Sequence, residues 1–136
     1  MKICILYNSR TGVTKKMAEE MFRYLSEYGA SPTLSSIQQY DPEKLKNADR
    51  ILLGTWTNGL FLFAQHPDRK WKKWIKTIPV AEPEKIGLFT TYKLLSGTQF
   101  KKMSQALQFT PELQLKSRNG KLSPENKNLL TAWLEK

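Results

Sequence analysis

Cysteine and histidine are nearly missing from this sequence, which has one residue of each, Cys4 and His66. A single cysteine cannot form an internal disulfide, and the apolar neighbours of Cys4 predict a buried thiol in a reducing compartment. Metal clusters and serine-type triads that need a second histidine are excluded. The position of His66 beside Pro67 predicts a role in a loop or a cap.

Long hydrophobic runs are missing as well. No stretch approaches the length of a membrane span, and the apolar run at residues 1–7 is too short for the core and linker of a signal peptide. Neither GxGxxG nor GxxxxGK[ST] occurs, which argues against dinucleotide or nucleoside triphosphate binding by those motifs. The 136 residues, 40% of them hydrophobic, fit one globular domain with its own core. We therefore expect a single domain, residues 1–136, in the cytoplasm.

Acidic side chains are scarce, with 12 Asp and Glu against 22 Lys and Arg and a net charge of +10. Residues 1–68 carry 8 basic and 7 acidic side chains, whereas residues 69–136 carry 14 and 5. A field of this sign favours an acidic protein partner, an anionic ligand, nucleic acid or a membrane surface. On charge alone, a solvated basic face without a specific partner fits equally well.

Apolar periodicity predicts five strands that alternate with five helices. The expected strands are residues 1–7, 33–37, 50–55, 85–91 and a half-exposed edge strand around 113–115. The expected helices are residues 13–28, 41–46, 67–78, one opening near Gly97 and running through Leu107, and 123–134. Such alternation implies an α/β fold with a parallel sheet, helices on both faces and a ligand site beyond the carboxyl ends of the strands.

The segment SRTGVT, residues 9–14, lies between the first predicted strand and the first predicted helix. Ser9, Thr11 and Thr14 offer hydroxyl donors, and Gly12 lets the backbone turn tightly. The amides of residues 10–14 can surround an anion at the helix N-terminus, where the helix dipole favours negative charge. An ordinary N-cap would explain one hydroxyl, but three hydroxyls favour a phosphate.

This segment resembles the phosphate loop of the flavodoxin family, which reads Thr or Ser, any residue, Thr or Ser, Gly, any residue, Thr. SRTGVT matches every defined position. The resemblance implies a flavodoxin-like, doubly wound, five-stranded parallel sheet in the order 2-1-3-4-5, with helices on both faces. It also implies FMN as the cofactor, bound without a covalent link. The residues expected to hold the phosphate are Ser9, Arg10, Thr11, Gly12, Val13 and Thr14.

Two further loops are expected to reach the flavin, because in the family the loops after the third and fourth strands usually place aromatic rings against it. The residues expected in the first loop are Thr55, Trp56, Thr57, Asn58 and Gly59, and those in the second are Thr90, Thr91, Tyr92 and Gly97. Trp56 and Tyr92 are the candidate stacking rings. A core position for Trp56 and a surface position for Tyr92 remain open, and the apolar run 60–63 could wall the ring, dock a partner or fold onto the core.

The sequence departs from the family in two ways. The last of the three candidate cofactor loops, which contains Thr90, Thr91, Tyr92 and Gly97, lacks an acidic Gly-Asp signature, and the net charge of the protein is basic rather than acidic. The resemblance implies an electron carrier, rather than a turnover enzyme, between redox proteins. The shortage of acidic residues in the two candidate flavin loops and the basic net charge favour partners with an acidic docking surface. We expect a monomer and no nucleic acid partner. Two alternatives stay open: a small FMN-dependent oxidoreductase acting on a quinone or similar molecule, and a flavin-free basic binding module.

Overall fold

The computed structural model describes residues 1–58, 65–78, 82–93 and 96–136. Its strands are β1 (Lys2–Asn8), β2 (Ser31–Ser36), β3 (Arg50–Asn58), β4 (His66–Pro67), β5 (Ile86–Thr91) and β6 (Leu113–Ser117). Its helices are α1 (Val13–Tyr28), α2 (Pro42–Lys46), α3 (Arg69–Ile75), α4 (Gln99–Leu107) and α5 (Pro124–Leu134), with a 3-10 turn, η1, at Pro83–Lys85.

Five strands form a parallel sheet in the order β2-β1-β3-β5-β6, which confirms the predicted topology. The two-residue strand β4 was not predicted. It pairs antiparallel with the end of β3, where Asn58 faces His66 and Thr57 faces Pro67. His66 therefore lies in a short strand, and the predicted loop or cap role for it is wrong.

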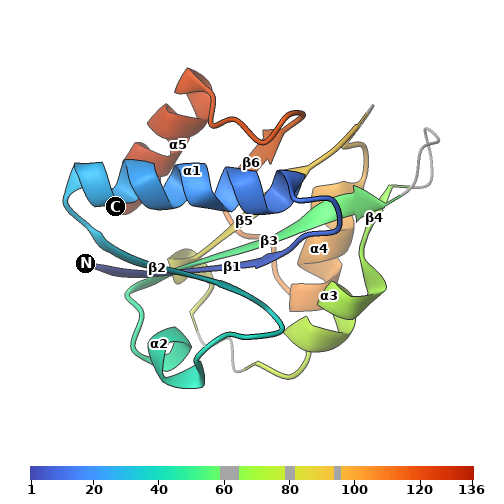
Figure 1. Cartoon of the computed structure of the whole chain (residues 1–136). Helices are drawn as coiled ribbons and strands as arrows, with labels where there is room; N and C mark the ends of the chain where they lie inside the picture. Colours follow the sequence, from blue (N-terminus) through green and yellow to red (C-terminus); the bar gives the residue numbers. More distant parts are fainter. Residues whose placement is uncertain (59–64, 79–81, 94–95) are drawn as a thin grey trace.

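The sheet is covered on both faces, with α1 and α5 on one side and α2, α3 and α4 on the other (Figure 1). Neighbouring residues of the central strands point to opposite layers, as the pleat of a strand requires. In β1, Ile5 packs in the layer under α1 and Leu6 in the layer under α3 and α4. Because both faces are buried, the strand reads in the sequence as one continuous apolar run.

Several helix ends lie where local signals predicted them. Gly29 follows α1 with a φ of 101°, in the left-handed region that favours glycine. The carboxylate of Asp41 accepts a hydrogen bond from the Glu43 amide at 3.0 Å, and the Ser123 hydroxyl accepts one from the Asn126 amide at 3.0 Å. These contacts cap α2 and α5.

Two elements end three residues from their predicted ends, and the other boundaries differ by at most two residues. The third strand was expected to end at residue 55, but β3 continues to Asn58 because β4 pairs with its last residues. The third helix was expected over residues 67–78, but Pro67 belongs to β4 and α3 covers only Arg69–Ile75. Among the described residues, no helix has the length and apolar character needed to cross a bilayer.

Candidate functional site

The segment between β1 and α1 is organised by Ser9. Its hydroxyl oxygen accepts hydrogen bonds from the amides of Gly12 at 3.1 Å and Lys15 at 3.3 Å. Gly12 has a φ of 93° and stands immediately before the first residue of α1, with open space where a Cβ would lie. A side chain at this position would be strained by the backbone conformation rather than by contact.

The start of α1 has the donors that a phosphate needs. The amides of Val13 and Thr14 lie in the first helical turn, where no intrahelical acceptor exists, and the described residues supply no other acceptor. The first turn contains no acidic residue, and Lys15 and Lys16 are exposed. Thr11 is also exposed. This donor set fits the terminal phosphate of FMN.

Thr14 links this loop to the end of β5. Its hydroxyl and that of Thr91 are 2.6 Å apart and share a hydrogen bond in which either can donate. Both side chains are buried. Since the pair has two hydroxyl protons and the shared bond uses one, the other proton stays available to a further acceptor.

Trp56 lies near the end of β3, where it is half-buried and belongs to neither core. The guanidinium of Arg10 lies over its ring, 5.3 Å from the ring centroid. The Trp56 carbonyl accepts a hydrogen bond from Gln99 Nε2 at 3.0 Å. The structure therefore brings Arg10 of the segment 9–14 against Trp56. The expectation that Trp56, Thr57 and Asn58 lie in a loop after the strand is wrong, because β3 extends through Asn58.

Thr55 and Thr90 are fully buried, and their side chains interact within the protein. The Thr90 hydroxyl donates its one proton to the Thr55 carbonyl at 2.6 Å. In its 3.1 Å contact with Thr57, Thr90 must therefore accept, and the Thr57 hydroxyl donates. Gln99 Nε2 donates to the same Thr90 oxygen at 3.1 Å. These contacts join the carboxyl ends of β3 and β5 to the start of α4.

The remaining predicted residues that the structure describes, Asn58, Tyr92 and Gly97, lie around the same edge of the sheet. Tyr92 follows β5, is half-buried, and its amide donates to the Ser117 carbonyl at 3.2 Å. Gly97 has a φ of 48° and packs so closely on Gln65 that a Cβ would clash with that side chain. Asn58 is half-buried beside β4. Gly59 and the apolar run 60–63 lie outside the described residues.

Sequence reasoning missed a polar network at the end of β1. Asn8 is buried, and its Nδ2 donates to Asp68 Oδ2 at 2.7 Å and to Thr55 Oγ1 at 3.3 Å. Asp68 was predicted only as part of a helix start, because nothing local pairs it with a residue 60 positions earlier. The network places a carboxylate at the edge of the sheet that carries the loop 9–14.

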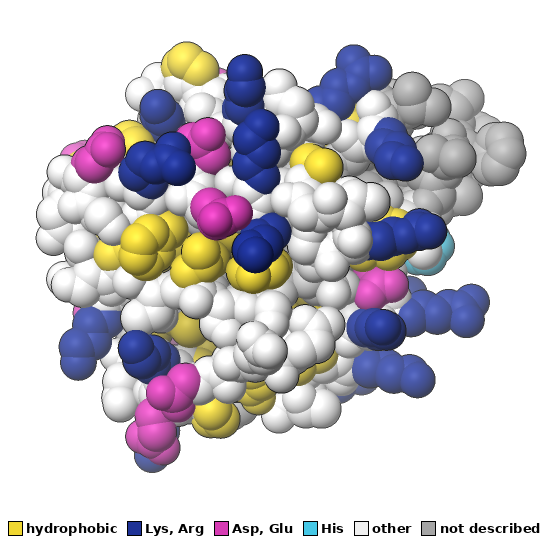
Figure 2. All heavy atoms as spheres, viewed as in Figure 1, with side chains coloured by type: hydrophobic (Ala, Val, Ile, Leu, Met, Phe, Trp, Pro, Cys, Tyr) yellow, Lys and Arg dark blue, Asp and Glu magenta, His cyan; other side chains and the backbone are white. Residues whose placement is uncertain are grey.

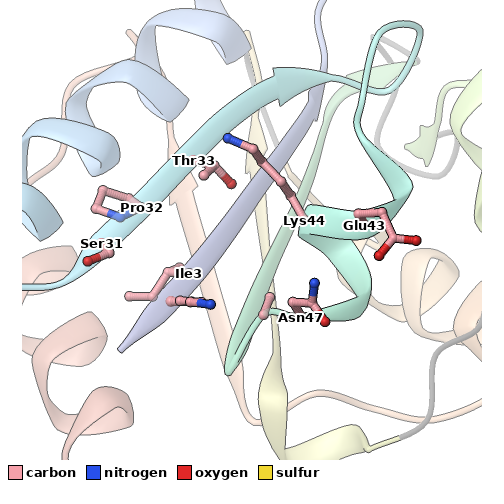
Figure 3. Close-up of a pocket in the computed structure, with 9 residues that line it drawn as sticks. Ile3, Ser31, Pro32, Thr33, Glu43, Lys44 and Asn47 are labelled. Atoms are coloured by element: carbon pink, nitrogen blue, oxygen red, sulfur yellow. The ribbon is translucent and has the colours of Figure 1, made fainter.

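A cavity of about 310 Å³ lies elsewhere, between β2 and α2. Figure 3 shows Lys44 extending from α2 toward Thr33 of β2, with Asn47 and Ile3 nearby. None of the predicted cofactor residues lines this cavity. It is therefore separate from the site at the carboxyl ends of the strands.

Cys4 is buried, as predicted, and its side chain packs in the core on the side of the sheet covered by α2, α3 and α4. Burial raises the pKa of its thiol above the usual range, and a hydrogen bond with Thr33 partly opposes this rise. The neutral thiol behaves as a small apolar core group. It contributes no nucleophile to the site.

Comparisons with known proteins show the same fold. The structure is similar to the solution structure of two-electron reduced flavodoxin from Megasphaera elsdenii, with 22% identity, a TM-score of 0.74 and coverage of 98% of this chain and 99% of that one. Oxidised flavodoxin 2 from Bacillus cereus gives 21% identity, a TM-score of 0.71 and coverage of 99% of both chains.

A longer protein shares the same fold over part of its length. Rubredoxin oxygen:oxidoreductase from Desulfovibrio gigas matches with 16% identity and a TM-score of 0.70, covering 98% of this chain and 34% of that one. No curated protein matches the sequence. A family model described as a flavodoxin domain matches residues 4–122. Since that match spans most of the chain, the protein belongs to the flavodoxin family, whose cofactor is FMN.

Proposed function

We propose that residues 1–136 act as one flavodoxin-like domain that carries electrons one at a time between redox proteins. Bound FMN supplies the redox chemistry, and the chain supplies binding, stacking and electrostatics. The observation that carries this proposal is the loop 9–14, in which Ser9, the left-handed Gly12 and the free amides of α1 form an anion site in a member of this family.

The phosphate is held by residues 9–14. The exposed Thr11 hydroxyl and the amides of Val13 and Thr14 donate to its oxygens, and the Ser9 hydroxyl proton is available because its oxygen only accepts from backbone amides. The spare proton of the Thr14 and Thr91 pair adds a further donor. Arg10 contributes positive charge, and Gly12 allows the left-handed turn before α1.

The flavin ring stacks on Trp56, with Tyr92 as the second ring. The half-buried position of Trp56 supports this assignment, because a core tryptophan would be enclosed on both faces. Thr57, Asn58, Gly59, Thr91 and Gly97 supply polar or backbone contacts around the ring. Thr55 and Thr90 act indirectly, because their buried hydroxyls hold the strand ends in place.

The partners are redox proteins with an acidic docking surface, and the carrier works as a monomer in the cytoplasm. The net charge of +10 supports the sign of the partner surface, since complementary charges accelerate encounter and orient the two proteins. No side chain is assigned a catalytic acid or base role.

Absorbance of the purified protein tests the proposal. We expect flavin bands at close to one FMN per chain, and reductive titration of this protein in two separate one-electron steps. Apoprotein should regain those bands when FMN is added. A folded apoprotein that binds no FMN would rule out the assignment, and rapid turnover of NAD(P)H with a quinone would favour an enzyme over a carrier.

A further inference from the structure

Positive charge is concentrated on α3 and the residue after it. The eight residues 69–76 contain five cations and no acidic residue. The cations are Arg69, Lys70, Lys72, Lys73 and Lys76. In the part of the chain that the structure describes, the ion pairs lie at other lysines and arginines, so none of these five has a carboxylate within 4 Å.

The clustered positive charges destabilise α3. Arg69 lies three and four residues before Lys72 and Lys73, and like charges at these spacings repel on a helix surface. Only Trp71 and Ile75 are buried residues of α3. Asp68, the one acidic group at its start, makes no side-chain cap and is held by Asn8 instead. The cations therefore remain uncompensated within the protein.

The neighbouring helix α4 is also positively charged. α4 packs beside α3, has no acidic residue in its first turn, and carries Lys101 exposed and Lys102 half-buried. Figure 2 shows dark-blue Lys and Arg side chains gathered along the edge of the molecule where Figure 1 places α3. We call Arg69, Lys70, Lys73, Lys76 and Lys101, which are all exposed, the basic face.

The basic face borders the site at the carboxyl ends of the strands. Asp68, directly before α3, contacts Asn8, which is followed by Ser9 of the phosphate loop. At the start of α4, Gln99 contacts the carbonyl of Trp56. Both helices of the basic face thus begin beside residues that we assign to the cofactor.

We infer that the basic face is the docking surface for an acidic redox protein, an inference that rests on the proposed function. Carboxylates of the partner would neutralise the unpaired cations and hold the partner's redox group near the site. Single-stranded nucleic acid fits less well, because Trp71 is fully buried and Trp74 half-buried, which leaves this face without an exposed tryptophan on which bases could stack.

Binding of a fluorescein-labelled peptide of glutamates to the FMN-loaded protein tests the inference by anisotropy at low salt. The basic-face variant changes Arg69, Lys70, Lys73 and Lys76 to Glu. The control changes Lys44, Lys46, Lys121 and Lys127, all exposed and outside the basic face, to Glu, so the two variants have the same net charge. We expect the basic-face variant to bind the peptide about tenfold or more weakly than the control.

Equal losses in the two variants would overturn the inference, because they would show that net charge alone governs binding. A DNA duplex that binds through the basic face more tightly than the peptide would also overturn it, in favour of nucleic acid. The flavin absorbance of each sample reports FMN binding separately, so failure of the proposed function is recognised independently. If the fourfold variant does not fold, the pair Lys70→Glu with Lys73→Glu is compared with Lys44→Glu with Lys46→Glu.

Discussion

The guanidinium of Arg10 covers the indole ring of Trp56 at 5.3 Å from the ring centroid. Arg10 is exposed, so this cation–π contact contributes about 0.5–1 kcal/mol. A charge-assisted hydrogen bond from the same side chain to a phosphate is worth more, about 1.5–3 kcal/mol. If Arg10 binds the phosphate as proposed, FMN would gain more from that contact than it would lose by displacing Arg10 from the indole.

Arg10→Ala should weaken FMN binding but not riboflavin binding, because riboflavin lacks the phosphate. We expect FMN affinity to fall by roughly tenfold, while riboflavin affinity stays unchanged or rises by about two- to fivefold as the indole is uncovered. Titration of the apoprotein with each compound, followed by flavin fluorescence, measures both. An equal loss for the two ligands would show that Arg10 does not interact with the phosphate.

Thr11→Ala and Gly12→Val should each weaken FMN binding. Thr11→Ala removes a donor to a charged group, which costs about 1.5–3 kcal/mol, or roughly ten- to a hundredfold in affinity. Gly12→Val keeps the backbone amide but is strained at a φ of 93°, so the turn that presents the amides of α1 should be distorted. Lys127→Ala, on the exposed surface of α5, is the control. Titrations that do not separate the loop variants from this control would remove the phosphate assignment.

Trp56→Ala should weaken FMN binding by about 1–3 kcal/mol, the range for lost stacking of an aromatic ring on a base. FMN should also quench the fluorescence of Trp56. Trp71, Trp74 and Trp133 contribute to the same signal, so the quenching is taken as the difference between the parent protein and Trp56→Phe, which retains a ring. An identical decrease on FMN addition in both proteins would place the flavin away from residue 56.

The potential of the second one-electron reduction of bound FMN, from semiquinone to hydroquinone, should respond to the charges of Lys93 and Asp68. Residues 55–67 and 90–100 contain no acidic side chain, and Lys93 is exposed, so the potential should lie above that of flavodoxins with an acidic surround. Asp68, held at this edge by Asn8, partly offsets the effect. A charge about 10 Å from the ring, at an effective dielectric near 30, contributes roughly 1 kcal/mol, or about 40 mV.

Asp68→Asn removes a negative charge and should raise the second potential by about 40 mV, whereas Lys93→Glu reverses a charge and should lower it by about 80 mV. Potentiometric titration of the FMN-loaded variants measures both shifts, and Lys127→Glu serves as a distant control. The electrostatic argument is wrong if neither variant moves the potential further than the control does.

Gly54→Ala should destabilise the sheet. Gly54 of β3 lies opposite Phe89 of β5, and a Cβ at residue 54 would clash with the Phe89 ring. Such overpacking costs about 1–3 kcal/mol of unfolding free energy, and urea denaturation of the apoprotein measures it. Leu129→Ala, at a residue 45% exposed, should change the free energy far less. Equal midpoints for the two variants would contradict the predicted contact.

The predictable part of the fold depends on local signals. Asp41 before Pro42 and Ser123 before Pro124 start helices through contacts within a few residues, and Gly29 ends one in the same way. The continuous apolar run of β1 shows that it is buried on both faces. These features need no knowledge of which strands pair.

The missed features depend on the register between distant segments. The Asn8 contact with Asp68 and the position of Arg10 over Trp56 form only when strands and loops are assembled. A two-residue strand such as β4 has no periodicity of its own to predict. Burial of the Thr55 and Thr90 hydroxyls likewise follows from neighbouring strands, whereas the sequence shows only polar residues after an apolar run.

The hydrogen bond between Thr14 and Thr91 joins residues 77 positions apart. Separation of β5 from β3 would therefore break a contact of the phosphate loop, although that loop belongs to the first βα unit. A ligand on the loop is then linked to the global opening of the protein rather than to fraying at one helix end. Amide hydrogens in the central strands and at the start of α1 would accordingly exchange as one cooperative unit, with its protection increased by bound FMN.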